Sequence, residues 1–390
     1  AGLYEDFNHL YIFNMRGNAL GLGEIRKKEG GNVFGAGTRT SVAVSILVKD
    51  DSDSHELHYY DIGDYLSQKD KLEIIEDFTD ISSIDWATIL PDENNDWLNQ
   101  RDPNYQKYAS LAGESTSVFN NNSMGILTSR DAWVYGYSKE KVAQNTERLV
   151  QNYNNELKRL KNIPVNERKD LLNRKSNHIN WSRKLERFAV NDIELEFHQS
   201  HLKLSLYRPF TKKWVYHDKA LNEEARLYYN KFGQNNLVIN TTGRGATRDF
   251  SPLVVDCIPS NDFMEKGQGF MRYDNEVDET SLFQNNDNLN QEFADKLGLN
   301  LDDTFSYVYG LLNSKEYQEK YTNDLKKDLA RIPIAQNKER YVEVGKALMD
   351  LHLNYEEVPV YDGVDITPFV NPSYKVTKMR FAKKRDENGK

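Results

Sequence analysis

Two runs of hydrophobic residues near the amino end have the length of strands. They predict strands over residues 10–15 (LYIFNM) and 41–49 (SVAVSILVK). The second run is almost continuously apolar, which indicates a strand covered on both faces, as in a sheet sandwiched between helices. Because two strands cannot form a covered sheet alone, we expect the chain to be a piece of a larger protein.

The next segments change from strand-like to helical periodicity. A strand-like ELHYYDI is followed by a helix-like DYLSQKDKLEIIEDF. Ser138 is a good N-cap for a helix over residues 139–162. A second basic helix is predicted around residues 166–174, after an interruption at Pro164.

The second half of the chain predicts strands first and helices afterwards. Between residues 193 and 260 we expect strands in IELEFH, LKLSLY, WVYH, NLVIN and PLVVDCI. One helix is expected to begin at Ser314 and another to cover residues 339–352. The fold class predicted from these patterns is α/β (α+β), with a helical spacer before a β-rich domain.

Composition excludes several classes of protein. At 390 residues with a net charge of −9, the chain has no apolar run long enough for a membrane helix and no start typical of a signal peptide. Its one cysteine, Cys257, excludes a disulfide framework and a multi-cysteine zinc site. We therefore expect a cytoplasmic protein with no membrane partner.

Metal binding and catalysis are not predicted. The pairs His55/His58 and His198/His201 lie in strand-like sequence, where residues three apart point to opposite faces. No GxxxxGK[ST] loop for ATP and no spaced nuclease carboxylates occur. We therefore expect no catalytic residue, no cofactor-binding residue and no metal ligand in this chain.

Charge is distributed unevenly along the chain. Acidic segments at 51–102 and 274–306 flank basic segments at 139–187 and 201–250. This pattern has two interpretations that the sequence leaves open. The basic segments either bind a polyanion through local positive potential or simply form solvated helix and strand faces.

The stretch SLYRPFTKKWVYHD, residues 205–218, places cations among aromatic rings. Such a pattern suits nucleic acid, which offers phosphates and stackable bases, although an ordinary strand and turn would look the same. Glycines beside Arg244 in TTGRGATRDF would also let backbone amides approach phosphate. The candidate DNA-binding residues are Arg208, Lys212, Lys213, Arg244, Arg248, Thr242 and Arg130.

Several long motifs, in order along the chain, resemble one protein family. They are MRGNALGLGEIRKKEGGNVFGAGTRTSVAVSILVKD, GILTSRDAWVYGYSKEKVAQN, SLYRPFTKKWVYHD, YVYGLLNSKEYQEKYTNDLKKDLARIPI, ALMDLHLNYE and YKVTKMRF. They look like the carboxy-terminal part of type ISP (single-polypeptide type I) restriction–modification enzymes. In that family one chain carries a nuclease, a helicase motor, an adenine-N6 methyltransferase and a target recognition domain.

The resemblance implies three parts. Residues 1–60 would be the last strands of the Rossmann-like methyltransferase sheet. Residues 61–190 would form a connecting segment and basic helical spacer, and residues 191–390 a target recognition domain, truncated at its carboxy end. Phe34, just before the last strand, matches the family position that stacks on a flipped target base.

The resemblance also implies a function and partners. The chain would recognise a duplex DNA sequence, positioning an adenine for methylation or licensing cleavage. Its partners would be double-stranded DNA and the nuclease, helicase and methyltransferase core of the same polypeptide. S-adenosylmethionine, ATP and Mg²⁺ are implied for the full-length enzyme, not for this piece, which lacks the NPPY-type tetrad. Two alternatives remain open: a complete divergent methyltransferase, and a module that docks other domains.

Family-wide motifs belong to the scaffold when the enzymes that share them read different sequences. We therefore expect Arg208 to contact phosphate or support structure, rather than to read bases. By the same argument, Tyr207, Phe210 and Trp214 are expected in the core, with Lys212 and Lys213 reaching phosphate.

Overall fold

The computed structural model describes residues 2–21, 23–175, 178–233, 235–275, 286–359 and 363. The strands are β1 (His9–Arg16), β2 (Val42–Val48), β3 (Glu56–Asp61), β4 (Ala87–Ile89), β5 (Ala109–Ser110), β6 (Tyr135–Gly136), β7 (Leu202–Arg208), β8 (Thr211–Tyr216), β9 (Val238–Thr241), β10 (Pro252–Val255), β11 (Ile258–Pro259), β12 (Gln268–Met271) and β13 (Arg331–Ile332).

The α-helices are α1 (Gly2–Asp6), α2 (Gly23–Glu29), α3 (Gln68–Asp77), α4 (Asp131–Val134), α5 (Lys139–Leu160), α6 (Val165–Arg168), α7 (Arg183–Val190), α8 (Tyr228–Lys231), α9 (Gln291–Leu297), α10 (Leu301–Leu312), α11 (Lys315–Lys320), α12 (Thr322–Lys327) and α13 (Lys338–Leu353). Short 3-10 helices cover Ile81–Ser83, Tyr105–Lys107 and Gln199–His201. The mixed α/β class is as predicted, and no helix in the described ranges is both long and apolar enough to cross a membrane.

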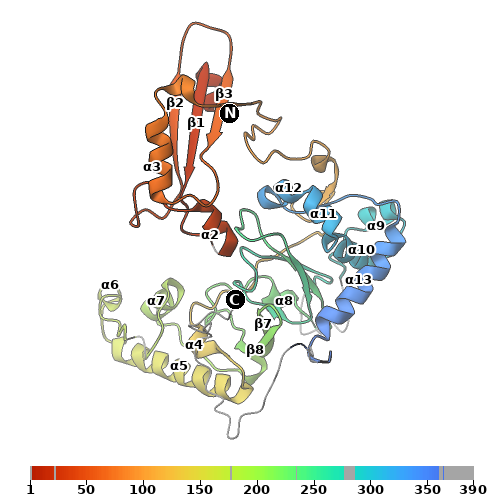
Figure 1. Ribbon diagram of the computed structural model, residues 1–390. Coiled ribbons are helices and arrows are strands. Elements are labelled where there is room, and N and C mark those ends of the chain that lie inside the picture. Colours follow the sequence, from red (N-terminus) through yellow and green to blue (C-terminus); the bar gives the residue numbers. More distant parts are fainter. Residues whose placement is uncertain are drawn as a thin grey trace. The chain divides into compact units, whose positions relative to one another are not determined.

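The amino-terminal sheet has the strand order β2-β1-β3-β4. Figure 1 shows β2, β1 and β3 side by side in this order. The predicted strands are confirmed as β1 and β2, which pair antiparallel, while β1 and β3 pair parallel with His9 opposite Glu56. A small hydrophobic cluster around Phe13, Met15 and Ile62 lies on this sheet. Helix α3 begins at Ser67 with a capping box, which satisfies two backbone donors at its first turn.

Strand β2 differs from its sequence prediction in one respect. Its apolar composition predicts cover on both faces, yet Val44, Ile46 and Val48 are 42%, 44% and 37% exposed. In the described sheet β2 stands at the edge, with β1 as its one neighbour. The elements of the described chain therefore do not supply the cover that its sequence predicts.

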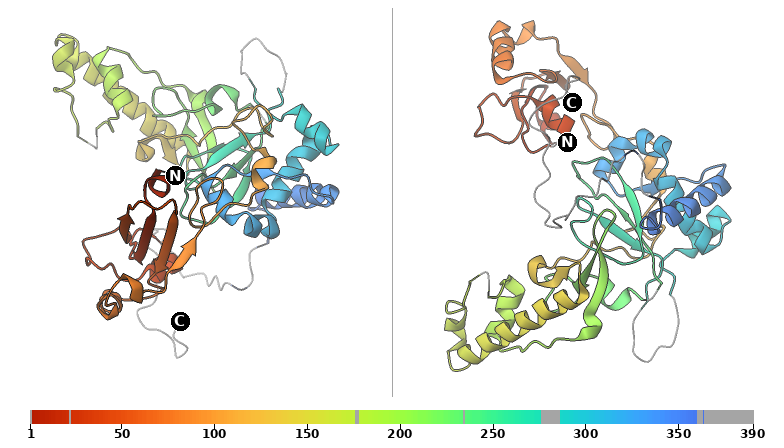
Figure 2. Two further views of the ribbon diagram at one scale, coloured as in Figure 1. Left: turned by 90° about the horizontal axis from the view of Figure 1, so that it is seen from above. Right: turned by 60° about the horizontal axis from the view of Figure 1, so that its bottom comes forward.

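A second sheet, in the order β11-β7-β8-β6, packs against the long helix α5. Figure 2 shows α5 extending along this region. The prediction of this helix is confirmed, since Val142, Leu149, Tyr153, Leu157 and Leu160 form its buried stripe. Ser138 caps it by accepting a hydrogen bond from the backbone N–H of Lys141.

Two neighbouring predictions are wrong. Residues 193–198 form no strand, because the Asn154 side chain on α5 takes both backbone groups of Leu195, accepting from its N–H at 3.1 Å and donating to its carbonyl at 2.8 Å. The helix expected over 166–174 is only the single turn α6. Its Arg168 is buried and donates to the carbonyls of Ile163 and Val190.

A third sheet, β10-β9-β12, joins α9, α10 and α13 in a separate hydrophobic cluster. The sequence predicted α13 but not α10, in which every residue from Thr304 to Leu312 is buried. The helix expected from Ser314 is split into α11 and α12 at Tyr321. The described residues up to Leu353 form one compact unit, and residues 354–359 and 363 belong to another. The YKVTKMRF motif lies outside the described residues.

Candidate nucleic-acid interface

The β7–β8 hairpin carries the first group of predicted site residues. The two strands pair antiparallel from Leu202 opposite Tyr216, and the register shifts before Arg208 pairs with Thr211. Between them Pro209 and Phe210 form the turn, with Phe210 in the left-handed region at φ 54°. The hairpin thus presents its cations on neighbouring strands.

Lys213 and Arg208 rest on the ring of Tyr207. The ammonium of Lys213 lies 3.7 Å from that ring's centroid, and the guanidinium of Arg208 lies 4.4 Å from it. The Tyr207 hydroxyl donates to Asp131 at 2.8 Å, which fixes the ring. Partial burial lowers the pKa of Lys213, while the charge of Asp131 opposes that shift. No carboxylate among the described residues forms an ion pair with either cation, and aromatic rings hold both in place.

Tyr137 and Lys139, which were not among the predicted site residues, extend this arrangement. Strand β6 pairs with β8, with Gly136 opposite Trp214, and so brings the segment after β6 beside the hairpin. The ammonium of Lys213 is 5.0 Å from the ring of Tyr137, which is 73% exposed, and that of Lys139 is 4.8 Å from the ring of Trp214. The alternation of rings and cations in YGYSK was the available signal. We define the cation–ring surface as Tyr137, Lys139, Tyr207, Arg208, Lys213 and Trp214.

The expectations for the rest of the hairpin need correction. Phe210 is not in the core but 47% exposed. Tyr207 and Trp214 are only partly buried and pack at the margin of the hydrophobic cluster. Lys212 forms an ion pair with Asp256, at 3.2 Å between Nζ and Oδ1. Of the two lysines expected to reach phosphate, only Lys213 has no short ion pair to an acid among the described residues.

The loop after β9 carries the second group. Arg244 is 64% exposed at its side chain, with a long ion pair of 3.9 Å to Asp328, and Arg248 is exposed. Thr242 is partly buried, and its hydroxyl accepts from the backbone N–H of Ser251 at 3.2 Å. Gly243 is required here, because a Cβ at that position would lie 1.8 Å from the carbonyl oxygen of Lys266.

The backbone amides of the two glycines beside Arg244 are already hydrogen-bonded within the fold, contrary to the prediction that they approach phosphate. Gly243 donates to the carbonyl of Glu265, and Gly245 donates to the carbonyl of Lys326. The Glu265 carboxylate accepts from the amides of Thr247 and Arg248, at 3.0 and 3.1 Å. Partial burial of Glu265 raises its pKa, but the hydrogen bonds from these backbone amides outweigh that effect and lower the pKa overall. What the loop offers outward is therefore its two arginine side chains.

The position of Arg130 argues against the prediction that it contacts DNA. Its side chain is 1% exposed. The guanidinium donates to the carbonyl of Leu221, to the hydroxyl of Ser182 at 2.7 Å and to the carbonyl of Asn180 at 3.3 Å. Burial lowers its pKa to about 10. Arg130 therefore joins three segments inside the fold.

Phe34 lies in the loop between α2 and β2 and is 74% exposed. Its ring therefore does not fill the core of the described residues. The Asn32 side chain accepts from the Phe34 N–H at 3.0 Å and donates to the Thr40 carbonyl at 2.8 Å, which ties the loop to its base. These hydrogen bonds restrain the backbone on either side of the exposed Phe34 ring.

A cavity of about 500 Å³ lies beside β7 and β11, and its lining includes His217, Tyr229 and Cys257. His217 is buried and its Nε2 lies 3.1 Å from the carbonyl oxygen of Ala225. Burial lowers the pKa of His217 to about 4 and raises the pKa of the Cys257 thiol to about 12. Cys257 is therefore a buried and unreactive thiol.

His217 makes stability depend on pH in a defined direction. The unfolded chain takes up a proton at His217 near pH 6.5, whereas the folded chain does so only near pH 4, so this contribution is complete above pH 6.5 and is lost as pH falls. From pH 7 to pH 5 the loss is expected to be about 2 kcal/mol. Urea unfolding of wild-type and His217→Gln proteins at both pH values measures it. An equal pH response in both would contradict it.

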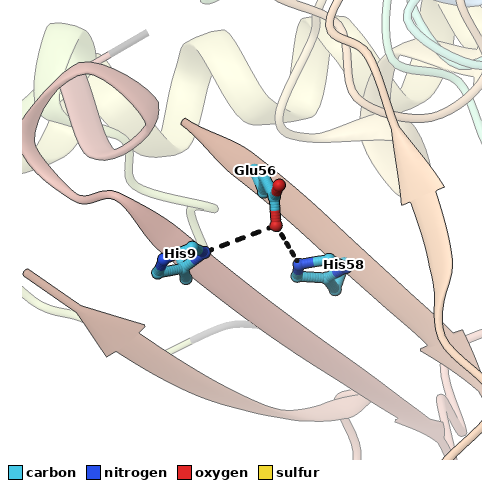
Figure 3. Close-up of side chains that lie close together, drawn as sticks. All are labelled: His9, Glu56 and His58. Atoms are coloured by element: carbon cyan, nitrogen blue, oxygen red, sulfur yellow. Dashed lines mark hydrogen bonds and ion pairs between the residues drawn. The ribbon is translucent and has the colours of Figure 1, made fainter. Parts of the chain in front are cut away.

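Three potential metal ligands meet at the end of the amino-terminal sheet. His9 on β1 and Glu56 and His58 on β3 lie close together, with all three ligand atoms within 4.8 Å of one another (Figure 3). The sequence did not predict this group because His9 is remote from the other two along the chain. The alternation of Glu56 and His58 on one strand face was the available signal.

Comparison with known proteins gives a consistent result. Residues 117–389 match the family described as the Type ISP C-terminal specificity domain. The fold is similar to a nuclease-deletion mutant of the Type ISP restriction–modification enzyme LlaGI in complex with a DNA substrate mimic, with a TM-score of 0.84 and 44% identity, covering 99% of this chain and 36% of that chain. No curated protein matches the chain.

Two further solved structures are similar. The DrdV–DNA complex gives a TM-score of 0.78 at 29% identity, covering 92% of this chain and 36% of that one. The ATP-dependent Type ISP restriction–modification enzyme LlaBIII bound to DNA gives 0.79 at 31% identity, covering 93% of this chain and 24% of that one. The chain thus spans about a third or less of each of these proteins.

Proposed function

Because the chain belongs to the family of Type ISP C-terminal specificity domains, we propose that it recognises a specific duplex DNA sequence for a cytoplasmic restriction–modification enzyme. Recognition would position a target adenine for N6 methylation from S-adenosylmethionine, or license cleavage. The chain itself would supply the reader and not the catalyst. The observation that carries this proposal is the similarity over 99% of the chain to a Type ISP enzyme in complex with a DNA substrate mimic.

Two groups of cations support the proposal. The cation–ring surface offers Lys139, Arg208 and Lys213, whose positions are restrained by aromatic rings. Restrained cations lose less conformational freedom on meeting phosphate, which favours binding. The loop after β9 adds Arg244 and Arg248, whose guanidinium groups suit bidentate contact with phosphate or guanine. We propose that the cation–ring surface contacts the phosphates of the DNA backbone. Loops outside the motifs shared with the family would then read the bases.

The amino-terminal sheet supports the proposal that this chain is continuous with a methyltransferase core in one polypeptide. Residues 1–60 would be the end of a methyltransferase core, followed by a spacer over 61–190 and a recognition domain over 191–390. The exposed apolar edge strand β2 would pair with the remaining strands of that core, because an uncovered edge of this kind otherwise invites aggregation. Phe34 would face the target base there, where a flat apolar ring replaces the lost stacking.

Selection from a pool of random duplexes tests the proposal directly. The folded 390-residue chain is expected to enrich one short sequence, and its affinity for that sequence should fall steeply with added salt. The proposal would be overturned if a chain shown by circular dichroism to be folded selected no preferred sequence at low salt. A rise in melting temperature with S-adenosylmethionine would instead favour a complete methyltransferase.

Removing two cations of the cation–ring surface is expected to weaken binding without changing its sequence preference. The double substitution Arg208→Ala with Lys213→Ala should lower affinity roughly tenfold and reduce the slope of log affinity against log salt by about 2, since each phosphate contact contributes about 0.9. Fluorescence anisotropy over a salt series measures both.

The matched control removes two exposed cations elsewhere, Lys69 and Arg340, which are 84% and 65% exposed at their side chains. The control variant should retain the wild-type affinity and slope. A slope unchanged in the Arg208/Lys213 variant would exclude this surface as a phosphate contact while leaving sequence recognition itself intact.

A further inference from the structure

The pairing of β1 with β3 brings two imidazoles and a carboxylate to one point. His9 is directly opposite Glu56 in the parallel register. Glu56 and His58 are two residues apart on β3, so their side chains point to the same face. The Glu56 Oε2 atom lies 3.5 Å from His9 Nδ1 and 3.2 Å from His58 Nε2 (Figure 3).

The two separations from Glu56 fit the coordination shell of a zinc-like cation, and the two histidine nitrogens lie within 4.8 Å of each other. Tetrahedral Zn²⁺ holds histidine nitrogen and carboxylate oxygen at about 2.0–2.2 Å, which places neighbouring ligand atoms about 3.3–3.5 Å apart. Both contacts of Glu56 lie close to that range. Two histidines and one carboxylate, with a position left for water, are also a donor set that zinc uses in proteins.

The surroundings provide outer support for such a site. The second ring nitrogen of His9, Nε2, lies 3.3 Å from Asp50, the arrangement by which a carboxylate orients a metal-bound imidazole. His9 Nδ1 is buried from solvent, yet it makes no hydrogen bond with any residue that the structure describes. The ring of His58 stacks on Tyr11, with centroids 4.6 Å apart. Each imidazole is therefore held in place by a residue outside the ligand set.

The group is open enough for an ion to enter. The side chains of His9 and His58 are 25% and 16% exposed, and that of Glu56 is 49% exposed. A cation at this point would also join two strands from distant parts of the chain at the end of the sheet. Binding would then stabilise the folded amino-terminal sheet, since the unfolded chain does not hold the three ligands together.

We propose that His9, Glu56 and His58 bind one divalent cation of the Zn²⁺ class, with Asp50 as the group that positions His9. This site is independent of DNA recognition. It lies on the amino-terminal sheet, whereas the cation–ring surface lies on β6, β7 and β8 and the segments beside them.

Calorimetric titration of the chelator-treated chain with ZnCl₂ tests the site. The wild-type chain should bind one equivalent and gain melting temperature, whereas His9→Gln and His58→Gln should lose both effects. His55→Gln is the matched control, because His55 lies in the same region and contacts the carbonyl of Phe7 instead of the group. Cobalt(II) should give the visible absorption of a four-coordinate ion in wild type and His55→Gln, but not in His9→Gln or His58→Gln.

Asp50→Asn keeps all three ligands, so it tests the site even if a variant that removes a ligand fails to fold. It should weaken Zn²⁺ binding about 10- to 100-fold. The proposal would be overturned if the folded wild-type chain failed to bind zinc. It would also be overturned if His9→Gln and His58→Gln bound zinc as tightly as wild type, which would leave a hydrogen-bonded His–Glu–His group without a metal. Sequence selection by the DNA assay should be the same for wild-type and His58→Gln chains, so the two proposals fail separately.

Discussion

Replacing Gly345 by alanine is expected to lower the free energy of unfolding by about 3 kcal/mol, at the upper end of the cost of overpacking. Gly345 lies where α13 crosses α10. A Cβ there would lie 1.9 Å from the carbonyl oxygen of Ser306 and 3.1 Å from the backbone nitrogen of Gly310. Backbone atoms cannot rotate away as a side chain can. Since every residue from Thr304 to Leu312 is buried, the helices would have to separate along their whole contact.

The sign of this effect distinguishes packing from helix propensity. In an exposed helix the same change would stabilise the protein by about 1 kcal/mol, because alanine is the better helix former. Gly37→Ala is the matched control, since a Cβ at Gly37 meets nothing within 4 Å. Urea unfolding followed by circular dichroism compares the three proteins. A Gly345→Ala chain as stable as wild type would mean that the helices do not cross this closely.

Replacing Arg130 by alanine is expected to cost about 3 kcal/mol of stability, from three lost hydrogen bonds at about 1 kcal/mol each. Hydrogen bonds from a charged donor are usually worth more than this. Burial of the guanidinium, which lowers its pKa to about 10, offsets part of the gain. The carbonyls of Leu221 and Asn180 and the hydroxyl of Ser182 would each lose a donor.

Two companion variants identify the cause. Arg130→Lys keeps the charge but cannot reach three acceptors in different directions, so it should recover only part of the loss. Arg244→Ala removes an exposed arginine and should change stability by less than about 0.5 kcal/mol. Thermal unfolding measures all three. If Arg130→Ala weakened DNA binding without changing stability, the assignment of Arg130 as a structural residue would be wrong.

Sequence patterns predicted an element well where its hydrophobic residues recurred with a period that places them on one face. Helix α5 is an example, because one side of it is buried and the other meets solvent. Helix α10 was missed for the opposite reason. From Thr304 to Leu312 this helix is buried on every side, so that part carries no contrast between a polar and an apolar face.

Local alternation misled where tertiary contacts replaced strand pairing. The segment IELEFH alternates polar and apolar residues, yet the Asn154 side chain satisfies the backbone of Leu195. A backbone needs its hydrogen bonds satisfied, but it does not need a strand to do so. The partner responsible lies on a different element, and no pattern within the segment reveals it.

The sequence by itself determined the chain's family, its mixed α/β class and the hairpin that carries cations among rings. Only the tertiary structure decided what each cation does. Lys213 rests between Tyr207 and Tyr137, Lys212 pairs with Asp256, and Arg130 is buried. The physical reason is that burial and hydrogen-bond partners depend on residues remote in sequence. The same holds for His9, which meets Glu56 and His58 only because β1 and β3 pair.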